Sequence, residues 1–313
     1  MKTLLFTFTA GLLWLTPLAA QAKITRTVEK TFAVQPGGLL TASTQGGDIK
    51  IQTGDITEVR ITARQNIRAN SEAEADEILR DLTLKLEQTG NDVVAEAKIE
   101  AKKSGFFGNW SNRVSVDFTI TVPKTYNLKL ATSGGDIAVA DLNGDVRART
   151  SGGDLHFERI AGNVDGATSG GDVFLKEGTA RAKLSTSGGD IVVERAGGPT
   201  EVSTSGGDIT LRSVAELMSA STSGGDIKAV VTGPITKDTV LSTSGGDVSV
   251  TLPKTASFRL DASTSGGDVD AVGLTITIEK GGKGKRSLVG AVNGGGPLLK
   301  LRSSGGDIAV RTE

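Results

Sequence analysis

The chain has 313 residues, of which 35 are basic, 36 acidic and 42 glycine, with one histidine and no cysteine. Without cysteine there can be no disulfide framework, thiolate zinc site or iron–sulfur cluster, and a single histidine cannot form a multi-histidine metal centre. A formal net charge of −1 provides no global field that would attract nucleic acid or an anionic bilayer, so neither is an expected partner.

Residues 1–22 have the pattern of a secretory signal peptide. Lys2 precedes an apolar run, and Ala20-Gln21-Ala22 matches an A-x-A cleavage site. The apolar run is shorter than the roughly 20 residues that a membrane span needs, and no later apolar stretch is long enough to span. We therefore predict export to the periplasm or the cell exterior, cleavage before Lys23 and no transmembrane segment.

The segment 23–128 is predicted to be a β-rich part with one short helix. Ser71-Glu72-Ala73-Glu74 is a capping box, which predicts a helix over about 71–81. Alternating apolar residues predict strands within 82–86, 93–99 and 114–122. A Gly-Gly-Asp corner at Asp48 matches the repeats that follow, so we expect this part to be continuous with them. Its helix is expected to cover the open end of the repeat stack.

One loop in this part is the candidate contact site. Phe106, Phe107 and Trp110 lie within five positions of one another, close to Lys102 and Lys103. Exposed aromatic side chains with basic neighbours would suit contact with a partner, and the alternative is a hydrophobic plug folded over the core.

An 18-residue repeat fills the segment 129–313. Ser-Gly-Gly-Asp followed by Ile, Leu or Val recurs, with aspartates spaced by 18 from Asp136 to Asp226 and then by 21, 21 and 39. Together with the upstream copy, the predicted turn aspartates are Asp48, Asp136, Asp154, Asp172, Asp190, Asp208, Asp226, Asp247, Asp268 and Asp307. Each unit carries two short alternating segments, nine residues apart, which predicts strand, turn, strand and turn.

Stacking these units at about 4.8 Å would line up their apolar residues as one continuous core. The predicted fold is therefore an all-β single-stranded β-helix, or β-solenoid, with about 18 residues per coil. An antiparallel sandwich would not keep so constant a spacing. At each corner, glycine is expected to supply positive φ, while Ser and Asp side chains bond nearby backbone N–H groups.

Calcium is an alternative role for a column of aspartates. In the calcium-binding β-roll each half-turn supplies ligands. The residues nine positions from the aspartates of this chain are Asp145, Asn163, Arg181, Pro199 and Leu217, so a second ligand row is lost after one coil. Hydrogen bonding is the favoured role of the column, and a cation-stabilised surface repeat protein is an alternative.

The sequence nominates no catalytic residue and no cofactor. His156 is expected to point outward, because it lies between the inward Leu155 and Phe157, and no acid or nucleophile is evident beside it. The outward charges Glu158, Arg159, Glu194, Arg195 and Arg212 are scattered and of mixed sign, as on a solvated face. A glycan-active β-helix enzyme is the alternative, and it would need clustered acids in a groove.

The segment Val122-Pro123-Lys124-Thr125-Tyr126-Asn127-Leu128-Lys129-Leu130, followed by repeated Thr-Ser-Gly-Gly-Asp-Ile, resembles the bacterial "putative adhesin" family over about 123–313. The resemblance implies an exported β-solenoid without catalytic residues. It points to a non-enzymatic cell-envelope protein, either an adhesin-like binding module or a structural scaffold. The expected partner is an envelope component, a glycan or another protein.

Overall fold

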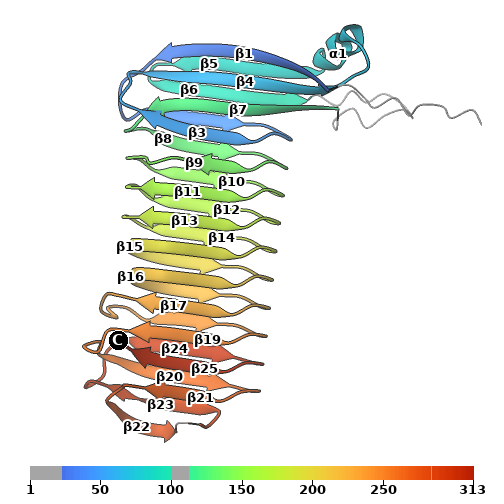
Figure 1. Cartoon of the computed structure of the whole chain (residues 1–313). Helices are drawn as coiled ribbons and strands as arrows, with labels where there is room; N and C mark the ends of the chain where they lie inside the picture. Colours follow the sequence, from blue (N-terminus) through green and yellow to red (C-terminus); the bar gives the residue numbers. More distant parts are fainter. Residues whose placement is uncertain (1–22, 100–112, 283) are drawn as a thin grey trace, which may run out of the picture.

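The computed structural model describes residues 23–99, 113–282 and 284–313, which form one elongated hydrogen-bonded assembly of 25 strands with a single helix (Figure 1). The chain winds into flattened coils, each with two short strands joined by two turns. Corresponding strands of successive coils pair in parallel, so two sheets face each other along the stack. The predicted β-solenoid is confirmed.

The middle of the solenoid follows the sequence coil by coil. Its strands are β8 (Asn127–Ala131), β9 (Ile137–Val139), β10 (Val146–Arg149), β11 (Leu155–Ile160), β12 (Val164–Ala167), β13 (Val173–Gly178), β14 (Ala182–Ser185), β15 (Ile191–Ser203), β16 (Ile209–Ser221) and β17 (Ile227–Val231). The register advances by one repeat per coil, so Leu155 pairs with Val173 and Val173 with Ile191. These inward side chains are buried and form the continuous apolar core.

One coil departs from the predicted alternation. Thr200 of β15 pairs with Leu217 of β16, but Glu201 pairs with Ser219, so Met218 forms a bulge. Leu217 is therefore buried and Met218 only half-buried, whereas the 18-residue spacing from the buried Thr200 places Met218 at the inward position. The pairing shifts by one residue between Val214 and Glu216, and the bulge at Met218 restores it, so the 18-residue period gives the wrong inward residue only between these two points.

The corner glycines are required by the spacing of the coils. Several described glycines have positive φ, but none of them belongs to a Ser-Gly-Gly-Asp corner, so the predicted backbone conformation is wrong. A Cβ atom on Gly153, the second glycine of its corner, would lie 2.1 Å from the carbonyl oxygen of Gly135 in the adjacent coil. Only glycine allows the backbones of successive corners to approach so closely.

A buried threonine hydrogen-bonds to the backbone of the corner from inside the fold. The hydroxyl of Thr150 donates to the carbonyl oxygen of Gly135 in the adjacent coil (2.9 Å) and accepts from the N–H of Gly153 in its own corner (3.3 Å). The same pair of bonds is made by Thr132, Thr168, Thr186, Thr204, Thr222, Thr243 and Thr264, and by Ser303. Each corner is thus bonded to its neighbour through a side chain inside the fold.

The N-terminal part is a wider head on the stack (Figure 1). Its elements are β1 (Lys23–Ala33), β2 (Leu39–Ser43), β3 (Ile49–Gly54), β4 (Glu58–Arg68), α1 (Glu72–Leu79), β5 (Leu82–Thr89), β6 (Asp92–Ile99) and β7 (Val114–Pro123). The coil β2–β3 lies between β6–β7 and β8–β9, and β4 pairs antiparallel with both β1 and β7. The predicted helix and the three predicted strands are confirmed.

Helix α1 does not cover the end of the stack. It packs beside the protruding ends of β4 and β7, where Ala75 and Ile78 join Ile67, Ala69 and Val114 in a second, smaller core. The expected capping position was wrong because β1, β4 and β7, with 11, 11 and 10 residues, extend past the corners, whereas middle strands such as β10 and β12 have four residues and end at them. This overhang exposes an apolar surface, which the helix buries.

At the C-terminal end, the spatial order of the last two coils differs from their order in the sequence. Its strands are β18 (Thr239–Ser242), β19 (Val248–Leu252), β20 (Phe258–Thr264), β21 (Val269–Val272), β22 (Ile276–Gly281), β23 (Ser287–Val292), β24 (Leu298–Ser303) and β25 (Ile308–Thr312). The last coil, β24–β25, lies between β18–β19 and β20–β21. Stacking every coil on the one before it in sequence, as the repeat predicts, is therefore wrong here.

In the described ranges, no helix combines the length and apolar character needed to cross a membrane.

Candidate functional site

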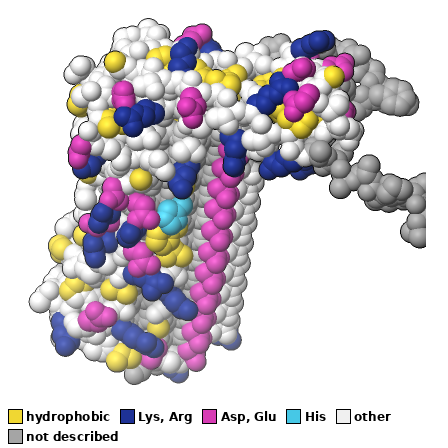
Figure 2. Space-filling view, turned by 45° about the horizontal axis from the view of Figure 1, so that its top comes forward, with side chains coloured by type: hydrophobic (Ala, Val, Ile, Leu, Met, Phe, Trp, Pro, Cys, Tyr) yellow, Lys and Arg dark blue, Asp and Glu magenta, His cyan; other side chains and the backbone are white. Residues whose placement is uncertain are grey.

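A ladder of aspartates runs along one edge of the solenoid. The backbone N–H of Asp154 donates to Oδ1 of Asp136, and that of Asp172 donates to Oδ1 of Asp154, each at 2.8 Å. The same bond joins every neighbouring pair of the column, whose spatial order is Asp48, Asp136, Asp154, Asp172, Asp190, Asp208, Asp226, Asp247, Asp307 and Asp268. The carboxylates are held at the surface and form the acidic column of Figure 2. Each aspartate therefore bonds the coil beside its own.

Asp117 is the first rung of this ladder, although its segment lacks the Gly-Gly-Asp motif. Its Oδ1 accepts from the N–H of Asp48 (3.3 Å), while its Oδ2 accepts from Arg64 (2.9 Å) and Asn66 (2.8 Å). No sequence motif indicates this role, which becomes evident only from the parallel pairing of β7 with β3.

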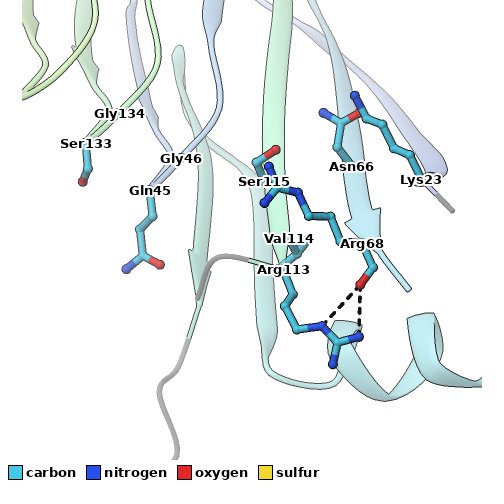
Figure 3. Close-up of a pocket in the computed structure, with 10 residues that line it drawn as sticks. All are labelled: Lys23, Gln45, Gly46, Asn66, Arg68, Arg113, Val114, Ser115, Ser133 and Gly134. Atoms are coloured by element: carbon cyan, nitrogen blue, oxygen red, sulfur yellow. Dashed lines mark hydrogen bonds between the residues drawn. The ribbon is translucent and has the colours of Figure 1, made fainter. Parts of the chain in front are cut away.

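A cavity of about 840 Å³ opens where the head overhangs this edge (Figure 3). Its lining residues are Lys23, Gln45, Gly46, Asn66, Arg68, Arg113, Val114, Ser115, Ser133 and Gly134. The ends of β1, β4 and β7 form one wall, and two corners form the other. The cavity exists because long head strands pass beyond short coils, so the side chains at their ends face the corner edge.

Arg113 fixes the base of the head wall. Its guanidinium donates to the carbonyl oxygen of Arg68 through Nη2 (3.1 Å) and Nε (3.3 Å), and it also pairs with Glu74 of α1. The Arg113 guanidinium and the backbone N–H of Asn70 hold the pKa of Glu74 below its usual range. Arg113 is therefore a neutralised structural cation that joins the helix to β4.

Two other cations, Arg68 and Lys23, line the cavity. Neither Arg68 nor Lys23 forms an ion pair within the described part of the chain. The Arg68 side chain extends toward Ser115, and the Lys23 side chain toward Asn66 (Figure 3). Gln45 and Ser133 contribute an amide and a hydroxyl from the corner wall. Both residues are exposed at the mouth of the cavity, and a guanidinium and an ammonium with such polar neighbours can bind a carboxylate or a phosphate.

The sequence-predicted contact residues Lys102, Lys103, Phe106, Phe107 and Trp110 lie outside the described residues. The residue that follows their segment, Arg113, lines the cavity. Sequence reasoning missed Lys23, Arg68 and Asn66. No local motif marks these residues, because they come together only through the antiparallel pairing of β4 with β1 and β7.

The outer face of the sheet that contains β11 and β13 carries paired charges. His156 is exposed, as predicted, and stacks on Phe174 of the adjacent coil with ring centroids 4.7 Å apart. Glu158 accepts from Lys176 (2.6 Å) and contacts His156 (3.1 Å), and these two neighbours lower the pKa of Glu158. Further cross-coil pairs join Glu177 to Arg195 and Glu194 to Arg212. These charges form ion pairs between coils. Arg159 and Glu177 also line a second cavity of about 340 Å³, together with Lys124 and Asp141.

The opposite edge holds a shorter ladder. Oδ1 of Asn127 accepts from the N–H of Asp145 (3.0 Å), and Oδ1 of Asp145 accepts from the N–H of Asn163 (2.8 Å). Arg181 occupies the next position, where the carboxylate and amide rungs end. Across the described ranges, no group of three or more His, Asp or Glu side chains is arranged to hold a metal ion.

The molecule is a two-sheeted β-solenoid with an aspartate ladder along one edge and an overhanging N-terminal head. The family model described as Toastrack DUF4097 matches residues 43–311, and the chain belongs to that family. The family resemblance predicted from the sequence is thereby confirmed. No curated protein matches the chain significantly.

Several solved structures are similar to this chain. A "putative adhesin" from Bacteroides fragilis NCTC 9343 has 16% identity and a TM-score of 0.39, with 92% of this chain and 97% of that chain covered. A "putative lipid binding protein" from Parabacteroides distasonis ATCC 8503 has 14% identity and a TM-score of 0.47, with 91% and 96% covered. A "putative cell adhesion protein" from Clostridium sporogenes ATCC 15579 has 14% identity and a TM-score of 0.24, with 92% and 100% covered.

Proposed function

We propose that the protein is an exported, non-enzymatic, adhesin-like binding module of the cell envelope, and that its head cavity holds the acid group of a saccharide ligand. The observation that carries the proposal is the pair Arg68 and Lys23, which line a polar cavity and have no acidic partner among the residues that the structure describes. An unpaired guanidinium presents donors that match the two oxygens of a carboxylate, which makes it a good anchor for an acidic sugar.

The other cavity residues suit the remainder of a sugar. Ser115 and Ser133 offer hydroxyls, and Gln45 offers an amide whose oxygen already accepts from the N–H of Ile99 (2.9 Å). Donors and acceptors placed around a charged anchor are how sites of this size fix the orientation of a polar ligand. Exposed serines continue along the corner edge from Ser133 to Ser151 and beyond, so a longer chain of sugars would find hydroxyls past the cavity.

Export and the aromatic loop belong to the same proposal. Cleavage before Lys23, predicted from the sequence, would add an α-ammonium group to a residue that lines the cavity. The loop with Phe106, Phe107 and Trp110 leads directly to Arg113, so we assign it the apolar face of the same ligand. Aromatic side chains supply large contact area to sugar rings at little entropic cost.

The test is binding of residues 23–313 to a panel of saccharides that carry a carboxylate, beside neutral saccharides of equal length. Arg68→Ala removes the proposed anchor. Arg60→Ala is the matched control, because Arg60 is exposed on the same strand but pairs with Glu58 outside the cavity. Phe106→Ala/Phe107→Ala/Trp110→Ala tests the loop.

We expect saturable binding of the acidic saccharides that weakens with salt and falls at least about tenfold in Arg68→Ala, but not in Arg60→Ala. Equal binding of neutral saccharides, or an unchanged affinity in Arg68→Ala, would refute the proposed anchor. No binding of any saccharide by the parent protein would leave the structural scaffold as the better account.

A further inference from the structure

The last coil of the chain is inserted between two coils that are consecutive in sequence. In one sheet Leu301 of β24 pairs with Leu241 of β18 on one side and with Ala262 of β20 on the other. In the facing sheet Ile308 of β25 pairs with Val248 of β19 and with Val269 of β21. The coil β24–β25 therefore fills a slot whose two walls come from residues 239–272.

The two walls of this slot match each other in register. Val248 and Val269 both face Ile308, and they are 21 residues apart. The same spacing joins Ile227 to Val248 in the coil before, where the two strands pair directly. With the inserted coil withdrawn, the two walls would face each other in the register in which the coil of Ile227 pairs with the coil of Val248.

The inserted coil donates corner hydrogen bonds to the coil on one side and accepts the equivalent hydrogen bonds from the coil on the other side. The N–H of Asp307 donates to Oδ1 of Asp247 (2.7 Å), while Oδ1 of Asp307 accepts from the N–H of Asp268 (2.8 Å). The Ser303 hydroxyl donates to Gly246 (2.8 Å), and the carbonyl of Gly306 accepts from the Thr264 hydroxyl (2.7 Å). These bonds depend on the repeat motif alone, so an identical coil from a second molecule would make all of them.

The segment that leads into the coil has the features of a hinge. Asn293 has φ 48° and is the only non-glycine residue of the described ranges with positive φ, and Gly294, Gly295 and Gly296 follow with φ of 90°, 88° and 156°. A Cβ atom on Gly294 would meet no atom within 4 Å, whereas one on Gly296 would lie 2.7 Å from the carbonyl oxygen of Ser257, so the loosely packed part of the loop is at Gly294. Asn293 anchors the start of the loop by donating to the carbonyl oxygens of Lys254 (2.9 Å) and Ala256 (2.8 Å). Three successive glycines can change backbone conformation at low cost.

We propose that β24–β25 is an exchangeable coil and that two copies of the chain associate by inserting this coil reciprocally into each other's slot. The contacts inside the slot are the same in the closed monomer and in the exchanged dimer. The balance between them is therefore set by protein concentration and by the conformation of the 293–297 hinge. The proposal is independent of the head cavity, which lies at the other end of the solenoid (Figure 1).

The absence of native cysteine makes the exchange directly measurable. Ser249→Cys/Ala309→Cys places two half-exposed thiols on paired positions of β19 and β25. Their disulfide lies within one chain in the monomer and between two chains in the exchanged dimer. The matched control is Lys228→Cys/Ser249→Cys, a paired position of β17 and β19 that stays within one chain in both forms. Both variants are refolded over a range of concentrations, oxidised and separated on a non-reducing gel.

We expect interchain disulfides in Ser249→Cys/Ala309→Cys that increase with refolding concentration, at least about fivefold above the control pair. Purely intrachain disulfides at every concentration, or equal interchain linkage in both variants, would overturn the proposal. A second measurement does not depend on disulfides. Deleting Gly294–Gly296 should strain insertion within one chain and shift the mass in solution to a dimer. A folded monomer after this deletion would equally overturn the exchange.

Discussion

The middle and the two ends of this solenoid are built from the same corner but are held together differently. In the middle, the partner of every strand lies one repeat away, as in the pairing of Val146 with Val164 and of Val164 with Ala182. At the ends, the coil β2–β3 and the coil β24–β25 contact strands that are far from them in sequence on at least one side. The comparison shows that one repeat motif can support both sequential winding and insertion.

The ends also carry contacts that the repeat does not provide. Tyr126, at the start of the first regular coil, is fully buried and donates its hydroxyl to the carbonyl oxygen of Asn91 in the head. The Asn91 side chain in turn donates to the carbonyl of Gln35 (2.8 Å) and accepts from its N–H (2.6 Å). Such specific bonds join segments whose register no repeat sets.

The largest predicted effect tests the packing of the middle corners. Gly153→Ala would place Cβ 2.1 Å from a backbone oxygen of the adjacent coil, whereas Cβ in Gly152→Ala would lie 3.6 Å from its nearest neighbour. We expect Gly153→Ala to lower the free energy of unfolding by at least about 3 kcal/mol, and Gly152→Ala to change it by less than about 1 kcal/mol. Urea unfolding of both variants measures the difference. Equal losses would show that the corner needs glycine for another reason.

The next prediction concerns the N-terminal end. Burial, assisted by the charge of Asp92, raises the pKa of Tyr126 to about 12. An unfolded tyrosine ionises near pH 10, so the contribution of neutral Tyr126 to stability is complete below that pH and is lost as pH rises toward 12. At pH 7, Tyr126→Phe should cost roughly 1–2 kcal/mol, because the carbonyl of Asn91 loses its donor.

The pH dependence separates this bond from simple packing. Between pH 10 and 12 the parent protein should lose about 2 kcal/mol more stability than Tyr126→Phe does, since all other titrating groups are common to both. Thermal unfolding at matched pH values measures the two curves. Parallel curves across this range would mean that Tyr126 ionises freely in the folded protein.

The same contrast explains what could be predicted from the sequence. The regular coils could be predicted from the sequence, because each unit contains both of its strands and the partners of Val173 lie 18 residues away on either side. The place of the last coil could not, because Asp268 and Asp307 carry the same motif and either would bond to Asp247. The cavity could not either, since Arg68 reaches the corner edge only through the overhang of β4.

The smallest predicted effect returns to the middle coils, at the edge opposite the aspartate ladder. Asp141 accepts from the Arg159 side chain through Nε (3.0 Å) and from the Arg159 backbone N–H (3.1 Å). The Arg159 guanidinium lowers the pKa of Asp141. A carboxyl group with a lowered pKa contributes stability above its unfolded pKa, and this contribution is lost as pH falls through the folded value.

Asp141→Asn should therefore lower the free energy of unfolding at pH 7 by less than about 1 kcal/mol, as is usual for an ion pair at the surface. The deficit should shrink in high salt and disappear under acid conditions, where the parent carboxyl is also neutral. Urea unfolding at pH 7 and pH 3 measures it. A deficit that persists at pH 3 would indicate that Asp141 acts through its shape and hydrogen bonds. The charge of Asp141 would then contribute nothing to the stability of the stack.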